Sequence, residues 1–200
     1  LTEELMMENA AQELESCVMP HVFHESSRYI NRPCVLILAG RGNNGADGYA
    51  LARRLSCHDF CVAVCCIGEP SSEIAKVQKK RAELLGVSFI SPYDLDSFVE
   101  EKSFDISVVV DCVYGSGFHL PLDAESEAVI QSANKIEAFK VSCDVPSGLD
   151  SDGNGKIVFR ADETVAMGAL KLSLFSDKAK DFCGKRSEER RVGKECRSRW

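Results

Sequence analysis

The 200-residue chain lacks the long apolar segments that membrane proteins contain. No apolar run approaches the roughly 20 residues that a membrane-spanning helix needs, and no basic segment followed by an apolar stretch marks a signal peptide. We therefore expect a cytoplasmic protein that has no membrane partner. Leu1 stands where an initiating methionine would, which indicates that the natural start, together with any targeting segment, lies upstream.

Paired cysteine motifs are also absent, although the chain contains ten cysteines. A structural zinc site usually needs two C-x-x-C pairs at a fixed spacing, and the sequence has no such pair. Six of the cysteines lie in or beside apolar runs, where a free cysteine behaves as a small hydrophobic residue. We therefore expect reduced thiols in the core, rather than disulfides or zinc, and a cytosolic compartment. These six are Cys34, Cys61, Cys65, Cys66, Cys112 and Cys143.

An excess of basic residues is missing as well, because the net charge is −7. The basic stretch is Arg186–Trp200, which reads RSEERRVGKECRSRW and shows neither helical nor strand periodicity. A basic tail can serve as a nucleic-acid arm, but this string resembles the translation of a common DNA-sequencing adapter. We therefore expect residues 186–200 to be a non-native tail, residues 1–185 to form one domain, and no nucleic-acid partner.

Buried runs and amphipathic segments alternate along the rest of the chain. Residues 34–39 read CVLILA, an uninterrupted apolar run that is typical of a strand covered on both faces. Leu5, Ala10, Leu14 and Val18 recur at helical spacing. Strands that alternate with helices form right-handed βαβ units. The sequence therefore predicts an α/β fold, a three-layer α-β-α Rossmann-like sandwich with a mostly parallel sheet.

The same patterns predict the individual elements, and Pro20 is expected to end the first helix because proline disfavours helical geometry in the residue before it. Helices are expected over residues 2–19, 49–55, 71–85, 93–101 and 122–138. Strands are expected over residues 34–39, 60–67, 87–90, 106–111, 139–144 and 164–167. Residues 40–48 are expected to form a glycine-rich turn between the first strand and the second helix.

The loop Gly40–Gly48 follows a predicted strand, and ligands of open α/β sheets bind beyond the carboxyl ends of strands. Its opening matches G-x-G-x-x-G, a pattern whose backbone amides hold phosphate at a helix N-terminus. Dehydrogenases also need an acidic residue about 20 positions further on, at the end of the second strand. Asp59 precedes that position and Glu69 follows it, so the fingerprint is incomplete for a hydride-transfer enzyme.

Two further loops begin with an acidic residue at the end of a predicted strand. Asp111 precedes the glycines Gly115 and Gly117, and Asp144 precedes a proline–glycine turn. Asp111 can also act simply as the cap of its own turn. We expect both carboxylates to lie at the same edge of the sheet as the glycine loop.

Four segments, in this order, resemble the signature segments of the YjeF N-terminal domain family: GRGNNGADGYALARRL, DCVYGSGFHLPL, VSCDVPSGLD and TVAMGALKLSLF. The opening LMMENAAQEL resembles that family's first helix, so the resemblance covers residues 1–185. It implies an NAD(P)H-hydrate epimerase, which interconverts the R and S epimers of NADHX and NADPHX in nicotinamide nucleotide repair. It also implies an NAD(P)H-hydrate dehydratase as partner, separate or fused, and a homodimer.

The resemblance further implies one potassium ion (K+) per subunit, held by Asn44, Asp111 and Ser147. Oxygen donors of this kind suit a large monovalent cation. Ala46 stands where the family usually has glycine, and an alanine would strain the loop if that position needs a positive φ. The residues implied to contact the substrate are Asn43, Asn44, Gly45, Ala46, Asp47, Gly115, Ser116, Gly117, Phe118, His119, Leu120, Pro121 and Asp144.

Epimerisation at the hydrated C6 requires an acid for the departing hydroxyl and a base for the incoming water. Asp144 is the first candidate for this proton transfer. Lys171 is a candidate for orienting or neutralising a carboxylate or phosphate, although a surface lysine explains it equally well. His119 is a weaker candidate, because an exposed turn histidine is the simpler interpretation.

Two other function classes fit parts of the pattern. An NAD-dependent oxidoreductase could use the same glycine loop, and a non-catalytic, dimerising scaffold could retain the fold without the chemistry. Retention of Asn44, Asp47, Asp111 and Asp144 favours a working site over a scaffold.

Overall fold

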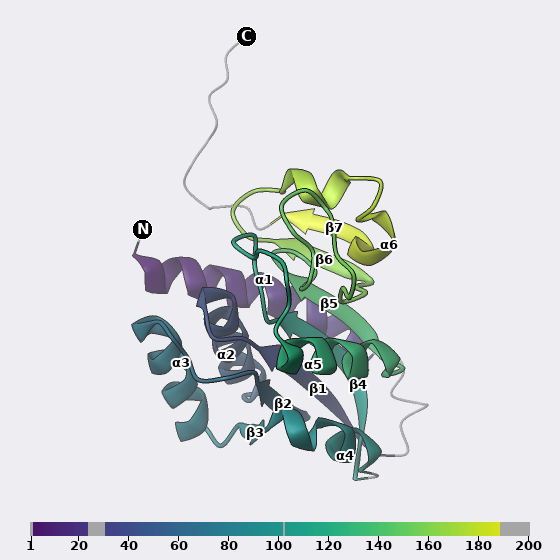
Figure 1. Cartoon of the computed structure of the whole chain (residues 1–200). Helices are drawn as coiled ribbons and strands as arrows, with labels where there is room; N and C mark the ends of the chain where they lie inside the picture. Colours follow the sequence, from purple (N-terminus) through teal and green to yellow (C-terminus); the bar gives the residue numbers. More distant parts are fainter. Residues whose placement is uncertain (1, 24–30, 102, 189–200) are drawn as a thin grey trace.

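The computed structural model describes residues 2–23, 31–101 and 103–188, which form a seven-stranded sheet with helices on both faces (Figure 1). The strands are β1 (Arg32–Ala39), β2 (Cys61–Cys66), β3 (Ser88–Ile90), β4 (Phe104–Cys112), β5 (Phe139–Cys143), β6 (Glu163–Ala166) and β7 (Lys185–Glu188). Their order is β3-β2-β1-β4-β5-β6-β7, and all neighbouring pairs are parallel. The predicted α/β class is confirmed, and the mostly parallel sheet is wholly parallel within the described residues.

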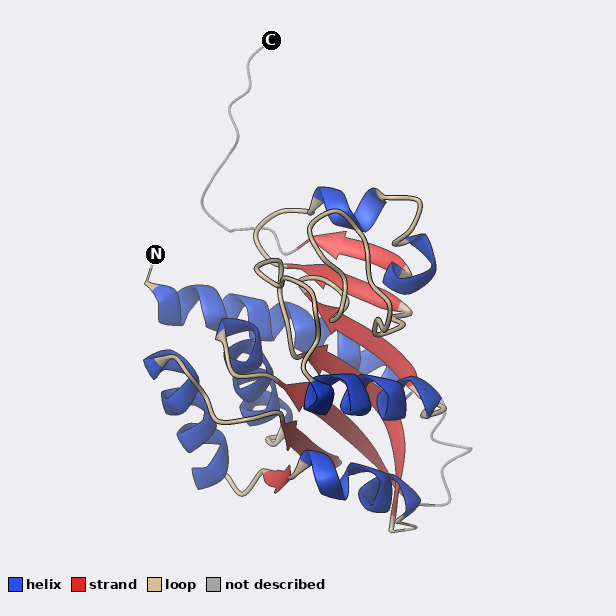
Figure 2. Cartoon of the chain, in the orientation of Figure 1, coloured by secondary structure: helices blue, strands red, loops and turns tan. Residues whose placement is uncertain are grey.

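The helices form the two outer layers of the predicted sandwich (Figure 2). The helices are α1 (Glu3–Phe23), α2 (Asn43–Leu55), α3 (Glu73–Leu84), α4 (Leu95–Glu100), α5 (Ala124–Lys135) and α6 (Lys180–Cys183), with 3₁₀ turns η1 (Pro92–Asp94) and η2 (Leu172–Phe175). Buried residues of α1, α2 and α3 share one core cluster with one face of the sheet. Buried residues of α4 and α5 share a second cluster with the opposite face.

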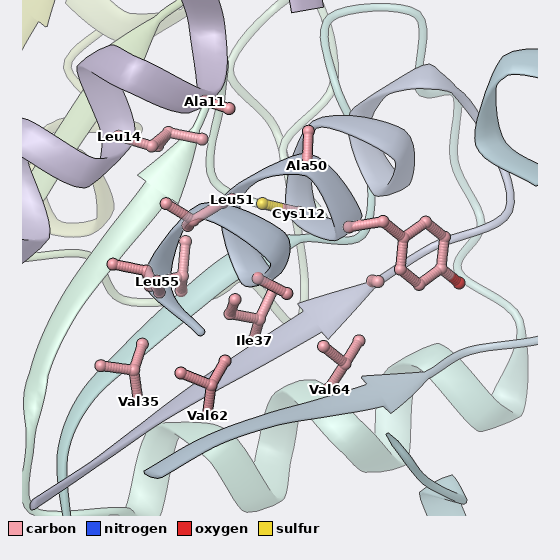
Figure 3. Packing of buried hydrophobic residues seen from close by; sticks show 14 of the residues in the cluster. Ala11, Leu14, Val35, Ile37, Ala50, Leu51, Leu55, Val62, Val64 and Cys112 are labelled. Atoms are coloured by element: carbon pink, nitrogen blue, oxygen red, sulfur yellow. The ribbon is translucent and has the colours of Figure 1, made fainter. Parts of the chain in front are cut away.

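Residues 34–39 of strand β1 are all apolar because their side chains are buried on both faces of the sheet. Val35 and Ile37 point to the core under α1 and α2, whereas Leu36 and Leu38 point to the core under α5, and all four are fully buried. Figure 3 shows the first of these cores, where side chains of α1 and α2 meet those of β1 and β2. Burying one such side chain contributes about 1.5–3 kcal/mol, so both faces of β1 stabilise the fold.

The strand order places a topological switch point between β1 and β4. The chain builds β1, β2 and β3 outward to one edge and then crosses back to place β4 on the other side of β1. The connection after β1 leads to α2 on one face, and the connection after β4 leads to α5 on the other. These two connections therefore separate at the carboxyl ends of β1 and β4, which is where α/β sheets open a crevice for ligands.

The prediction that Pro20 ends the first helix is wrong, because α1 continues to Phe23 with Pro20 inside it. A proline in a helix loses one backbone hydrogen bond and crowds the preceding turn. Val18 and Val22, on either side of Pro20, are both fully buried against the sheet. Their burial holds the last turn in place despite the proline.

The predicted start of the second helix at Tyr49 is also wrong, because α2 begins at Asn43 inside the expected turn. The glycines of this segment do not form a flexible loop. They allow α2 to pack closely against the backbone that precedes it. A Cβ atom added to Gly45 would lie 1.9 Å from the carbonyl oxygen of Gly40. Ala46 lies within the helix and is fully buried, so the strain considered for this position does not arise.

Ion pairs hold α1 against α2 and α3. Glu15 binds Arg54 with an O–N distance of 2.6 Å, Glu8 binds Arg53, and Glu4 binds Arg81 at 2.5 Å. The Glu4–Arg81 pair is exposed, and exposed pairs contribute little individually, whereas the other two pairs are partly buried. All three supplement the apolar contacts of α1 with the sheet.

The cysteines are free throughout the described residues, as expected. Burial raises the pKa of Cys65 to about 12, so this thiol stays protonated at neutral pH. The part of the chain that the structure describes contains no cluster of metal-ligating His, Cys, Asp or Glu side chains. It also contains no helix with the length and apolar character needed to cross a membrane.

The segment expected to be foreign, Arg186–Trp200, contributes its first three residues to β7, which pairs with β6. Its other residues, 189–200, lie outside the described residues. That the domain ends at Lys185 is an expectation about the origin of the sequence, and it stays a prediction.

The packing of α2 predicts that Gly45→Ala destabilises the protein although alanine is the better helix former. We expect the free energy of unfolding to fall by about 2 kcal/mol, because the new methyl group meets a backbone carbonyl and forces a backbone shift. Urea unfolding followed by circular dichroism measures this change. Gly117→Ala is the matched control, since nothing lies within 4 Å of an added Cβ there. Equal stability of the two variants would contradict the close packing.

Candidate functional site

A cavity of about 680 Å³ opens beyond the carboxyl ends of the central strands, at the switch point. Its walls come from the loop after β1, the start of α2, the loop after β4 and the residues that follow β2, β5 and β6. This volume is in the range of cofactor and ligand sites. The lining residues are Gly40, Arg41, Gly42, Asn43, Asn44, Asp47, Ile67, Val113, Tyr114, Gly115, Ser116, Gly117, Phe118, Asp123, Asp144 and Met167.

The structure brings together most, but not all, of the residues expected to contact a substrate. The expected residues that line the cavity are Asn43, Asn44, Asp47, Gly115, Ser116, Gly117, Phe118 and Asp144. Gly45 and Ala46 do not line it, because they lie on the buried side of α2. His119, Leu120 and Pro121 are exposed and lie beyond the lining residues of their loop, so substrate contact at these five positions stays a prediction.

The Asp111 carboxylate lies beneath the cavity at the end of β4, and it is fully buried. One of its oxygens, Oδ1, accepts hydrogen bonds from Ser147 Oγ at 2.6 Å and from Val113 N at 3.2 Å. The other, Oδ2, accepts from Ser147 N at 2.8 Å and from Ser142 Oγ at 3.3 Å. Burial raises the pKa of Asp111 to about 6, although all of these hydrogen bonds act to lower it.

Ser147 joins the loops that follow β4 and β5. Besides its two bonds to Asp111, its Oγ accepts a hydrogen bond from Tyr114 N at 2.9 Å. Asn44, at the start of α2, reaches the same region and donates from Nδ2 to the carbonyl of Cys143 at 3.4 Å. The three residues expected to hold a cation therefore come from the end of β4, the start of α2 and the loop after β5.

Asp144 follows β5 and points its carboxylate to the cavity wall. Its φ of 69° lies in the left-handed region, which a non-glycine residue rarely adopts. Its Oδ2 atom accepts a hydrogen bond from Ser116 N at 2.7 Å, and Oδ1 accepts one from Met167 N at 3.3 Å. A Cβ atom on Gly115 would lie 3.0 Å from Asp144 Oδ2 and 3.7 Å from Asn44, which shows how closely the three loops approach.

Lys171 forms an ion pair with Asp144, so it is not the free surface lysine that the sequence allowed. Its ammonium group also donates to the carbonyl of Met167 at 2.5 Å. The side chains of Lys171 and Asp144 are only 24% and 10% exposed, which weakens solvent screening of the pair. Asp144, the first candidate for proton transfer, and Lys171, the candidate for neutralising a carboxylate, are therefore in direct contact.

Several lining residues were not among the candidates from the sequence. Arg41 lies between two glycines of the first loop, a place where the motif itself specifies no side chain. Tyr114 and Asp123 face each other, with Tyr114 Oη donating to Asp123 Oδ2 at 2.6 Å. Met167 follows β6 and closes the wall beside Asp144.

Comparison with known proteins shows which family this chain belongs to. The family profile described as YjeF-related protein N-terminus matches residues 3–173. The bifunctional NAD(P)H-hydrate repair enzyme Nnr of Helicobacter pylori is 39% identical over 185 residues, which are 92% of this chain and 37% of that protein. The NAD(P)H-hydrate epimerase of Oenococcus oeni is 36% identical over 164 residues, which are 79% of this chain and 74% of that protein.

The solved structures add a match of fold. The crystal structure of yeast ynu0, YNL200c, has a TM-score of 0.77 to this chain at 19% identity, covering 94% of this chain and 78% of the yeast chain. The chain thus spans little more than a third of the Helicobacter protein but most of the Oenococcus one. The resemblance found in the sequence is confirmed: the chain belongs to the YjeF-related protein N-terminus family.

Proposed function

We propose that this chain is an NAD(P)H-hydrate epimerase domain, which interconverts the R and S epimers of NADHX and NADPHX at the hydrated C6 of the nicotinamide ring. Family membership and the printed activities of the Oenococcus and Helicobacter relatives support the substrate class. The observation on which the proposal depends most is the ion pair of Lys171 with Asp144, whose carboxylate lines the cavity of about 680 Å³.

The reaction exchanges a hydroxyl group between the two faces of the ring. The enamine nitrogen expels the C6 hydroxyl to give an iminium ion, and water then adds to the opposite face. The departing hydroxyl leaves as water once it receives a proton, and the incoming water gives up a proton, so atoms and charge balance. A proton donor and a proton acceptor must therefore both reach C6.

Asp144 and Lys171 supply these two functions in one place. The Asp144 carboxylate lines the cavity and can accept a proton from water, while Ser116 N, Met167 N and the Lys171 ammonium hold it in one orientation. The Lys171 ammonium group contacts this carboxylate, although Lys171 is not among the residues that line the cavity, and in this proposal it is the source of the proton for the departing hydroxyl. The backbone amides fix the direction of the carboxylate, which brings catalytic groups into position before the substrate binds.

The chemistry of the Asp111 region fits the implied potassium ion. The fully buried carboxylate has hydroxyl and backbone amide partners, and within the described residues it contacts no cationic side chain. Oxygens of Asn44, Asp111 and Ser147 would hold the ion. A bound potassium ion would supply the positive charge that compensates Asp111 and would polarise a substrate oxygen.

The printed name of one relative supports a partner enzyme. The Helicobacter protein is named as a bifunctional NAD(P)H-hydrate repair enzyme, and the present chain aligns with 37% of its length. We infer that the epimerase domain acts together with an NAD(P)H-hydrate dehydratase, fused or separate. The homodimer implied by the resemblance stays a prediction.

The ion pair predicts that Asp144→Asn and Lys171→Met each lower the epimerisation rate at least about 100-fold, the size typical of losing a general acid or base. The measurement is exchange between purified R and S epimers of NADHX, followed by NMR and corrected for the uncatalysed rate. Asp152→Asn and Lys178→Met are matched controls outside the cavity lining. An Asp144→Asn variant that folds normally and retains the parent rate would disprove the role of Asp144. Oxidation of NADH in the same samples would favour the oxidoreductase alternative.

The buried carboxylate predicts that potassium stabilises the protein. Exchanging choline chloride for potassium chloride at about 100 times the dissociation constant should raise the unfolding midpoint by about 5 °C, because the cation binds only the folded state. Asp111→Asn should abolish this rise, and Ser147→Ala should reduce it. Asp59→Asn is the matched control, since Asp59 is an exposed partner of Arg32. An equal rise in choline and potassium would show that no selective site exists.

A further inference from the structure

Arg41 has a fixed position at the wall of the cavity. It lies in the loop between β1 and α2, where its carbonyl oxygen accepts hydrogen bonds from Ser71 N at 2.8 Å and from Ser71 Oγ at 2.9 Å. Its side chain crosses Gly68, whose φ is 71°, so closely that an added Cβ there would lie 2.1 Å from Arg41 Nε. The connection between β2 and α3 therefore positions both the backbone carbonyl and the side chain of Arg41.

The Arg41 guanidinium has no protein anion bound to it. Among the described residues no hydrogen bond or ion pair of this group is found, whereas Arg53, Arg54 and Arg81 each bind a glutamate of α1. Arg41 is close enough for its charge to help lower the pKa of Asp123, where burial acts in the opposite direction and hydrogen bonds contribute more. Its five N–H donors thus remain available to a ligand.

The oxygens of Asp123 bind groups other than Arg41 and accept three hydrogen bonds from Tyr114 and Ser126. Its Oδ1 accepts a hydrogen bond from Ser126 N at 2.9 Å, which caps α5. Its Oδ2 accepts from Tyr114 Oη at 2.6 Å and from Ser126 Oγ at 2.9 Å. The capping role of Asp123 therefore leaves the neighbouring guanidinium open.

The other charges of the cavity wall make this cation necessary for an anionic substrate. Among the described residues that line the cavity, the charged ones are Arg41, Asp47, Asp123 and Asp144, so Arg41 is the single cation. A dinucleotide has a negatively charged pyrophosphate, and its 2′-phosphorylated form has a further phosphate. The guanidinium fork matches a phosphate group geometrically. The N-terminus of α2, at which Gly42 provides no side-chain cap, adds positive potential beside Arg41.

We propose that the Arg41 guanidinium binds a phosphate group of the substrate dinucleotide and thereby positions the hydrated nicotinamide ring against Asp144 and Lys171. The inference rests on the proposed epimerase function and adds to it the residue that anchors the anionic part of the substrate. Arg41 acts in binding rather than in proton transfer, so its loss should change KM more than kcat.

The test is steady-state epimerisation of NADHX and of NADPHX by Arg41→Gln and Arg41→Lys. Arg41→Gln should raise KM about 10-fold to 100-fold, the effect of losing a charge-assisted hydrogen bond, while kcat stays within about threefold. Arg41→Lys keeps the positive charge but lacks the forked guanidinium, so its KM should lie between those of the wild type and Arg41→Gln. A similar loss on both substrates assigns the pyrophosphate, whereas a loss confined to NADPHX assigns the 2′-phosphate.

Arg32→Gln is the matched control, because it removes the same charge at the opposite end of β1, where Arg32 pairs with Asp59. An unchanged KM in Arg41→Gln, or an equal rise in Arg32→Gln, would overturn the proposal. If the wild-type protein does not epimerise either substrate, the proposed function fails on its own. Calorimetric binding of ADP-ribose and of its 2′-phosphorylated form then tests Arg41 separately. Weaker binding by Arg41→Gln than by the wild type supports the proposal, and equal binding or none by the wild type refutes it.

Discussion

The arrangement of the candidate site depends on one buried carboxylate, that of Asp111. Its two oxygens accept four hydrogen bonds, two of them from Ser147, and these bonds join the loop after β4 to the loop after β5. Leaving one such buried acceptor without its donor costs about 1–3 kcal/mol, so the loops are held together by the need to satisfy this group. The cavity, the Asn44 side chain and the Asp144 carboxylate all take their places around that junction.

The layers of the fold were readable from the sequence because both faces of the sheet are covered. The run over residues 34–39 had to be apolar throughout, and the structure buries its two alternating sets in two different cores. The errors arose where tertiary packing overrides a local rule. Pro20 stays helical because buried valines flank it, and α2 starts early because Gly45 allows the helix to approach a backbone carbonyl. Neither contact is visible in a short sequence window.

The site was predictable in its loops but only in part in its contacts. Acidic residues at the ends of β4 and β5 and glycines after β1 marked the right edge of the sheet, since parallel strands bring their carboxyl ends together. The pairing of Lys171 with Asp144 spans 27 residues of sequence and has no local signal. Arg41 has no local signal either. Its significance depends on Asp123, a residue of another loop that serves as the N-cap of α5. Such long-range relations are properties of the assembled structure.

The backbone at Asp144 links this architecture to the chemistry. A non-glycine residue at a φ of 69° costs about 1–3 kcal/mol and persists only where its surroundings fix it, here through Asp144 N bound to the Val165 carbonyl and the carboxylate bound by Ser116 and Met167 amides. An extended backbone at this residue would direct the side chain elsewhere. The strain therefore has a functional consequence: the fold, rather than the substrate, sets the direction of the carboxylate, and Lys171 contacts it from the connection between β6 and η2. An anchored phosphate at Arg41 would then place the ring against a carboxylate that does not need to move.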